Sequence, residues 1–202
     1  YEIPLRLVGS EMCIRDSYGE IGNDLELYSN FVYFSLYNIA IMLYNIVKQI
    51  VQEGTAMSQK EKKKLVSIKT DDTLMETALH GTHLFPYKLY DDNITDYDFN
   101  CIDWHWHTEF EFVYIESGIV HFNVGEDNFD MSEGQGIFIN SKVVHKMHSE
   151  NDAVIPNFLF LPSLIAPKES LIYQKFVLPF LNSSLGYYIF SSSQEWQKEI
   201  LS

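Results

Sequence analysis

The sequence predicts an all-β barrel followed by helices near the C-terminus. Short runs rich in β-branched and aromatic residues, separated by Gly, Asn, Asp and Ser, follow one another from residue 83 to residue 161. Within them, residues 104–115 alternate bulky aromatic side chains with polar ones, which is typical of a strand facing the lumen of a β-sandwich or barrel. Residues 171–181 and 194–201 then have the apolar spacing and boundary residues of helices.

Residues 104–115 also contain a group of metal-ligating side chains. Side chains alternate between the two faces of a strand, so His105, His107 and Glu111 are predicted to share one face. Two imidazoles and a carboxylate on one face could hold a divalent metal or anchor a small polar ligand.

The spacing of these residues resembles a known family. H-x-H-x3-E-x6-G, which ends at Gly118, is similar to the first cupin motif, and residues 132–140 followed by His145 are similar to the second, with Ser132 in place of the usual proline. The resemblance implies an all-β cupin fold, a double-stranded β-helix or jelly-roll barrel, with C-terminal helices. It also implies that His145 joins His105, His107 and Glu111 as a possible metal ligand. His148 lies an odd number of residues from His145, so only one of the two is expected to point inward.

The C-terminal part resembles a narrower family. Residues 158–162, 172–179 and 194–196 are similar to the effector-binding and dimerisation domain of AraC-type transcription regulators. This resemblance covers about residues 57–202 and implies a homodimer that binds a small effector, such as a sugar, in the barrel lumen. It implies that Phe85 and Tyr87 join His105, His107, Glu111 and His145 as ligand contacts, although ordinary edge-strand packing explains Phe85 and Tyr87 equally well. DNA binding would belong to helix-turn-helix units beyond Ser202.

Composition limits the partners that the chain itself can bind. The formal net charge is −14, so the chain is not expected to hold nucleic acid through its general field. Cys13 and Cys101 are far apart and form no disulfide framework, which favours a reducing, cytoplasmic location. We expect Cys101 to be buried as a small hydrophobe.

The first part of the chain has several interpretations. Residues 7–17 resemble a translated sequencing adapter, so we exclude residues 1–17 from the fold. Residues 18–56 could be an untranslated leader before Met57, a packed helix, or a membrane anchor. We expect a solvated tail at 57–79 with a lysine-rich run, a cupin-like sensor domain at 80–190, and the start of a linker or dimerisation helix at 191–202.

Two functions remain open besides a membrane-anchored sensor that would depend on residues 18–56. The first is a non-enzymatic sensor domain of an AraC-type regulator, with no catalytic residue and no membrane partner. The second is a small metal-dependent cupin enzyme, an isomerase or dioxygenase, in which the four candidate ligands hold the metal. In both cases we expect His80 and His83 to be surface residues and His121 to face solvent from its strand.

Overall fold

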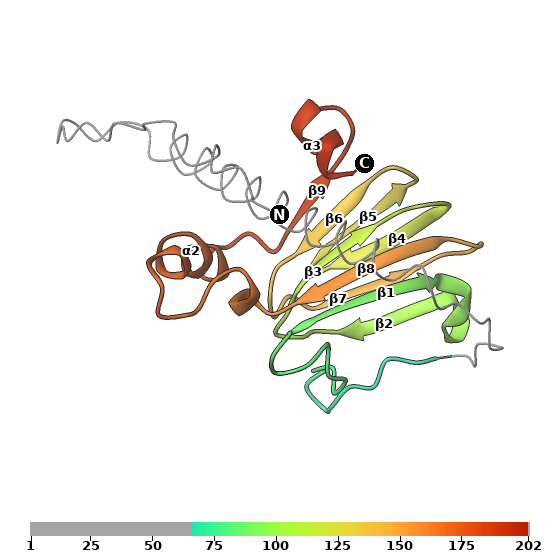
Figure 1. Cartoon of the computed structure of the whole chain (residues 1–202). Helices are drawn as coiled ribbons and strands as arrows, with labels where there is room; N and C mark the ends of the chain where they lie inside the picture. Colours follow the sequence, from blue (N-terminus) through green and yellow to red (C-terminus); the bar gives the residue numbers. More distant parts are fainter. Residues whose placement is uncertain (1–65, 202) are drawn as a thin grey trace, which may run out of the picture.

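The strands form two antiparallel sheets that face each other as a barrel (Figure 1). The computed structural model describes residues 66–201. One sheet has the strand order β1-β8-β3-β6-β9 and the other has the order β2-β7-β4-β5. The bounds are β1 (Tyr87–Asn93), β2 (Cys101–His105), β3 (Phe110–Tyr114), β4 (Ile119–Val124), β5 (Asp127–Ser132), β6 (Gly136–Ile139), β7 (His145–His148), β8 (Val154–Phe160) and β9 (Tyr187–Phe190). The predicted all-β cupin barrel with C-terminal helices is therefore confirmed.

Short helices connect the strands and follow the barrel. The 3-10 helices are η1 (Ile94–Asp96), η2 (Asp98–Asn100) and η3 (Pro162–Leu164), and a π-helix, η4 (Tyr173–Val177), continues into α2 (Leu178–Leu181). The last helix is α3 (Glu195–Ile200). It begins after Gln194, which makes no side-chain capping hydrogen bond, and none of the serines at 191–193 is its N-cap. Instead, the Gln197 side chain accepts a hydrogen bond from the Ser191 backbone N–H at 2.8 Å.

Inward-facing side chains fill most of the barrel lumen. Strand alternation buries Val120, Phe122 and Val124 of β4, whereas Ile119 is exposed. Inward residues of the other strands and of the connecting segments complete a lumen core of Ile94, Tyr97, Ile102, Val113, Ile115, Val120, Phe122, Val124, Met131, Ile137, Ile139, Met147, Ala153 and Ile155.

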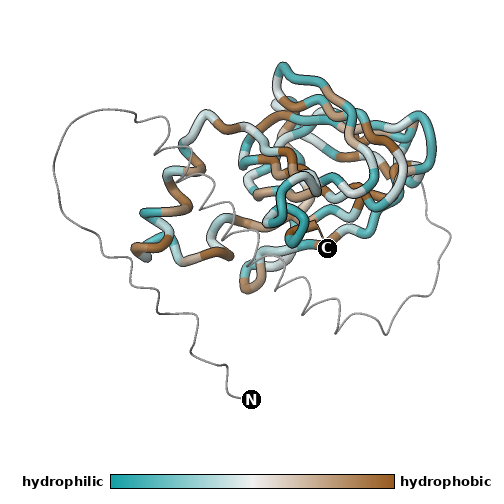
Figure 2. Tube along the Cα trace, turned by 90° about the horizontal axis from the view of Figure 1, so that it is seen from above, coloured by the Kyte–Doolittle hydropathy of each residue, from teal (hydrophilic) through white to brown (hydrophobic). Residues whose placement is uncertain are grey.

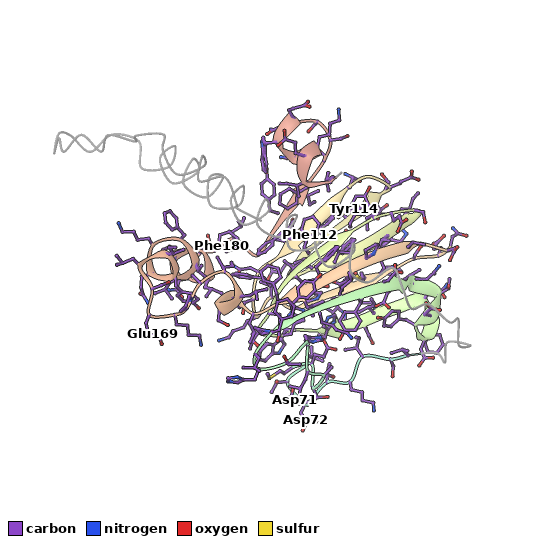
Figure 3. All side chains as sticks on the ribbon, viewed as in Figure 1. Asp71, Asp72, Phe112, Tyr114, Glu169 and Phe180 are labelled. Atoms are coloured by element: carbon purple, nitrogen blue, oxygen red, sulfur yellow. The ribbon has the colours of Figure 1, made fainter. Side chains whose placement is uncertain are left out.

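A second core lies outside the barrel, between the five-stranded sheet and the helical segment that ends in α2. This outer core consists of Tyr87, Phe110, Phe138, Phe160, Ala166, Tyr173, Val177, Phe180 and Phe190. Phe180 joins the two layers, because its ring centroid lies 5.8 Å from that of Phe110 and 5.3 Å from that of Phe138. Figure 2 shows the helical segment beside the closed ring of strands, and Figure 3 shows Phe180 between them. The outer core therefore attaches the C-terminal segment to the barrel.

The segment predicted as one central strand is two strands in different sheets. The chain leaves the four-stranded sheet after His105 and enters the five-stranded sheet at Phe110, so residues 106–109 cross between the sheets. Trp106 is held in this crossing because its backbone N–H donates to Leu74 O and its indole N–H donates to Thr73 O. The prediction of an uninterrupted strand was wrong because periodicity alone does not show where a strand changes sheets.

The polar residues 91–93 have the composition of a turn, but β1 continues through Asn93, which pairs with Val154 of β8. Two of these polar side chains instead make hydrogen bonds to residues close in sequence. Asp92 is buried and accepts a hydrogen bond from the Tyr97 hydroxyl, and Asn93 caps η1 by accepting from Thr95 N.

Residues 66–80 pack along the barrel, and we call them the arm. Val66 donates a backbone hydrogen bond to Asp96 O, and Glu76 N donates to Trp106 O at 2.9 Å. Figure 1 shows the arm running beside β2. We had placed these residues in a tail outside the sensor domain. The domain boundaries stay a prediction, but the arm forms part of the packed structure.

Several predictions concern residues outside the described part of the chain. They are the adapter-like segment at 7–17, the three interpretations of residues 18–56, and the lysine-rich run at 58–64. Within residues 66–201, none of the helices combines the length and the apolar character that crossing a bilayer requires.

Candidate metal and ligand site

Four buried side chains from three strands and one crossing segment converge at one end of the lumen. His105 ends β2, His107 lies in the crossing, Glu111 is the second residue of β3, and His145 begins β7. Their candidate ligand atoms all lie within 4.8 Å of one another. The structure thus brings together the four residues predicted as metal or ligand contacts.

Backbone carbonyl groups orient the three histidine rings. The Nδ1 atom of His105 lies 2.7 Å from Asp103 O, and that of His145 lies 2.9 Å from Val143 O. The Nδ1 atom of His107 lies 3.2 Å from the backbone O of Glu109. A carbonyl oxygen can only accept, so each Nδ1 carries a hydrogen. In a neutral ring Nε2 then keeps the lone pair, whereas in a protonated ring Nε2 can donate to a carboxylate. These three Nε2 atoms are the candidate ligand atoms.

The carboxylate of Glu111 lies among these nitrogen atoms. Its Oε2 atom is 2.8 Å from His145 Nε2 and 3.0 Å from His107 Nε2, and its Oε1 atom accepts a hydrogen bond from Asn157 Nδ2 at 2.7 Å. Although it lies close to the carboxylate, His145 Nε2 is buried without a hydrogen bond of good geometry to any described residue. A buried nitrogen without a partner is costly unless something binds its lone pair.

A divalent cation fits this donor set. Three imidazole nitrogens and one carboxylate oxygen are ligands that Mn²⁺, Fe²⁺ and Zn²⁺ accept in proteins. The hydrogen bonds from each Nδ1 to a carbonyl are the outer-shell contacts that fix the tautomer of metal-binding histidines. The cluster therefore has the composition and the orientation of a metal site.

The charges of the cluster favour an ionised carboxylate. Burial raises the pKa of Glu111, but the charge of His145 and the hydrogen bond of His107 outweigh burial, so the pKa lies well below its usual value. Burial lowers the pKa of His145, but attraction to Glu111 outweighs it and raises the pKa. Burial and then the charge of His145 lower the pKa of His105 to about 4. At neutral pH His105 is therefore neutral and its Nε2 lone pair is available.

A cavity of about 300 Å³ lies between the arm and this cluster. The arm contributes Lys69, Glu76 and His80, while the barrel contributes His105 and Glu111. Tyr90, Asp92 and Asn157 are further polar residues of the lining. A small ligand in this cavity would contact the arm and the candidate metal ligands together.

Phe85 and Tyr87 do not line this cavity. Phe85 is 45% exposed, and Tyr87 belongs to the outer core, on the sheet face opposite the lumen. Tyr90 and Asp92 of the same strand, which have the opposite parity, are the residues of β1 that reach the cavity. The role of Phe85 and Tyr87 as ligand contacts stays a prediction.

His80 is not the surface residue that we predicted, because only 7% of it is exposed. Its Nδ1 atom lies 2.9 Å from the Tyr90 hydroxyl, and its Nε2 atom lies 3.1 Å from Glu76 Oε2. Burial lowers the pKa of His80, but the hydrogen bond and charge of Glu76 outweigh burial and raise it. His80 thus connects the arm to β1 at the edge of the cavity. His83, by contrast, is exposed as expected.

Two other histidine predictions are confirmed. His145 is completely buried, whereas His148, on the opposite face of β7, is only partly buried. His121 has a side chain that is 32% exposed and lies beside Asp130. Cys101, which we expected to be buried, is only partly buried.

The sequence prediction missed Asn157, which donates to Glu111 from the middle of β8. An available signal was the isolated amide in Val154–Phe160, where the other residues are apolar. A polar side chain at an inward position of such a strand must find a partner, because an unpaired buried amide is costly.

Comparison with known proteins finds a family model and a regulator that resemble part of this chain. Residues 93–167 match the AraC-like ligand binding domain. The chain is 32% identical over 135 residues to the uncharacterized HTH-type transcriptional regulator YdeC of Bacillus subtilis (strain 168). This match covers 65% of the chain but only 45% of YdeC.

Similar solved structures include two cupins. A cupin superfamily protein from Desulfitobacterium hafniense DCB-2 has a TM-score of 0.30 and 7% identity, over 37% of this chain and 63% of that one. An RmlC-like cupin from Shewanella frigidimarina NCIMB 400 has a TM-score of 0.34 and 16% identity, over 37% of this chain and 65% of that one. The fold assignment rests on the strand pairing described above. The sequence matches show that residues 93–167 are similar to the AraC-like ligand binding domain and that the chain is similar to part of a transcriptional regulator.

Proposed function

We propose that this chain is the ligand-sensing part of an AraC-type transcription regulator and binds a small effector in the cavity between the arm and the barrel. The observation that carries the proposal is that this cavity reaches the buried cluster around Glu111 inside a domain of the AraC-like ligand-binding family. We further propose that the whole protein acts in the cytoplasm as a homodimer and contacts DNA through a helix-turn-helix domain, as the name of YdeC suggests.

The lining of the cavity favours a ligand that donates hydrogen bonds. Glu76, Asp92 and Glu111 place carboxylates around it, and the Oδ1 atom of Asn157 is buried without a hydrogen-bond partner among the described residues. Hydroxyl groups can donate to these acceptors, which makes sugars and other small polyols the first class to screen.

An effector in this position could act on the arm. The cavity is formed jointly by arm residues such as Glu76 and by barrel residues such as Glu111, so a bound molecule would stabilise the arrangement in which both contact it. An effector that makes the same contacts in two arrangements of the arm would not shift the equilibrium between them.

We also propose that His105, His107, Glu111 and His145 hold a divalent metal. Such a metal would supply Lewis acidity or a coordination position for an oxygen atom of the ligand. The protein would contribute the fixed Nδ1 tautomers and the burial that limits access of water.

The test is metal content followed by ligand screening of the whole chain. We expect protein purified without chelator to contain about one equivalent of metal per chain at this site, and His107→Ala to lose it. His83→Ala, which changes an exposed histidine, is the matched control and should keep it. A polyol that raises the melting temperature of the wild type, but not of Glu76→Ala, would support the cavity as the effector site.

A metal-dependent enzyme is the second candidate, and the four-residue donor set is the observation that favours it. The two functions differ in the fate of the bound compound. A compound found by thermal shift should be recovered unchanged after incubation with metal-loaded protein if the chain is a sensor. Conversion of the compound by the wild type, with loss of conversion in His107→Ala, would instead assign an enzyme.

A further inference from the structure

A second group of metal-ligating side chains lies on the outer face of the four-stranded sheet. Cys101 pairs with His148, His148 pairs with His121, and His121 pairs with Asp130. Directly opposed residues of antiparallel strands share a face, so the four side chains form one row across β2, β7, β4 and β5. We call them the outer row.

The outer row is separated from the lumen by the sheet itself. Each of its members is followed or preceded by a residue of the lumen core: Ile102, Met147, Phe122 and Met131. Because neighbouring residues in a strand point to opposite faces, the outer row points away from the lumen. The histidines of the row are therefore distinct from the cluster around Glu111.

His121 and His148 lie at a separation that one metal ion can bridge. Their ring centroids are 4.9 Å apart and their planes are inclined by 31°. Two nitrogens bound to one Zn²⁺ at about 2.0–2.1 Å and at a tetrahedral angle lie about 3.3 Å apart. Small rotations of two partly exposed rings can meet this requirement.

Both rings have a nitrogen lone pair to offer. His121 Nδ1 hydrogen-bonds to Asp130 Oδ1, and because a carboxylate only accepts, this Nδ1 carries the hydrogen and the lone pair lies on Nε2. The Nδ1 atom of His148 is buried and has no hydrogen-bond partner among the residues that the structure describes. Burial and then the charge of His121 lower the pKa of His148, which keeps this ring neutral at neutral pH.

We propose that His121 and His148 form a second, solvent-accessible site for Zn²⁺, with Asp130 orienting His121. A carboxylate behind a metal-bound histidine is a common arrangement, because it fixes the tautomer and raises the basicity of the ring. The His121 side chain is 32% exposed and that of Asp130 is 66% exposed, so the ion and its remaining water ligands can reach the site. Cys101 lies two strand spacings from His121, about 9.6 Å, which is too far for both to bind one ion.

Zinc stoichiometry of the full chain tests the proposal. Equilibrium dialysis with Zn²⁺ followed by elemental analysis should show one fewer bound ion in His121→Asn and in His148→Asn than in the wild type. The difference of one bound Zn²⁺ per chain between wild type and variant does not depend on whether the lumen site is occupied. Cys101→Ser and Glu111→Gln should keep the outer ion, and Glu111→Gln can lose only the lumen ion, so failures of the two sites are distinguishable.

A measurement on the unchanged protein guards against variants that fail to fold. In ¹⁵N-detected imidazole spectra of the wild type, added Zn²⁺ should shift the signals of His121 and His148, while those of the exposed His83 stay in place. Unchanged zinc stoichiometry in folded His121→Asn, or His121 and His148 signals that do not respond to Zn²⁺, would overturn the proposal.

Discussion

Replacing Asn157 by Asp tests the electrostatic arrangement of the lumen site with almost no change of shape. The wild-type amide donates to Glu111 Oε1 at 2.7 Å, and Glu111 is 1% exposed. In Asn157→Asp a second carboxylate replaces the donor, so a charge-assisted hydrogen bond is lost and two buried carboxyl groups face each other.

The expected cost follows from this burial. The substitution sets two buried carboxyl groups against each other, and leaving a buried charge uncompensated costs about 3–5 kcal/mol. At roughly 2–4 °C per kcal/mol for a chain of this size, the melting temperature at pH 7 should fall by about 6–20 °C. The carboxyl pair should share a proton, which raises the pKa of one group in the folded variant above its unfolded value. Binding of this proton stabilises the folded variant at low pH, and this stabilisation is lost as the pH rises. The difference in melting temperature between wild type and Asn157→Asp should therefore be smaller at pH 5 than at pH 7.

Thermal unfolding followed by circular dichroism in metal-free buffer measures both effects. Asn128→Asp is the matched control, because it makes the same chemical change at an exposed position of β5. Surface changes of this kind usually alter stability by less than about 0.5 kcal/mol. A melting temperature of Asn157→Asp equal to that of Asn128→Asp would refute the proposed contact between Asn157 and Glu111. Equal deficits at pH 7 and pH 5 would refute the shared proton.

Two further predictions concern packing. Phe180→Ala should destabilise by about 3–5 kcal/mol in urea unfolding, because it empties the position between Phe110 and Phe138 in the outer core, and a loss below about 1 kcal/mol would contradict this packing. Gly118→Ala should cost more than Gly125→Ala in the same assay. Both glycines have positive φ, but a Cβ at Gly118 would lie 2.6 Å from Asp152 O whereas one at Gly125 meets nothing within 4 Å, so equal costs would contradict the close approach at Gly118.

The four candidate ligands could be predicted from spacing, although the structure brings them together in a different way. A single strand would place His105, His107 and Glu111 on one face, yet β2 and β3 belong to different sheets. They converge because the crossing at residues 106–109 carries His107 over the end of the lumen, where strands of both sheets meet. The motif spacing therefore encodes a crossing between sheets, which strand alternation alone cannot show.

The contribution of the arm could not be predicted in the same way. Glu76 and His80 lie in a segment without clear periodicity, and the contacts of this segment include backbone hydrogen bonds to Trp106 and Asp96. Backbone donors and acceptors are the same in every non-proline residue, so a sequence carries little information about such pairing. The burial of His80 follows from this placement and not from its neighbours in sequence.

The sequence also does not show which face of β1 points to the cavity. Tyr87 and Leu89 pack in the outer core, while Tyr90 and Asp92 face the cavity, so both faces of this strand are covered. Alternation identifies an inner face only when the other face is in water. Aromatic residues of both parities therefore look alike in the sequence, and the prediction of Phe85 and Tyr87 as ligand contacts rests on the resemblance alone.

The lumen itself divides into an apolar end and a polar end, and this division positions the site. In β2 the inward residues run from Ile102 to His105, and in the paired strand β7 they run from Met147 to His145. In β3, Glu111 precedes Val113. Each strand thus contributes apolar side chains to one end, where burial stabilises the fold, and ligating side chains to the other. The apolar end can therefore hold the barrel rigid while the polar end, next to the arm, is left to bind a metal and an effector.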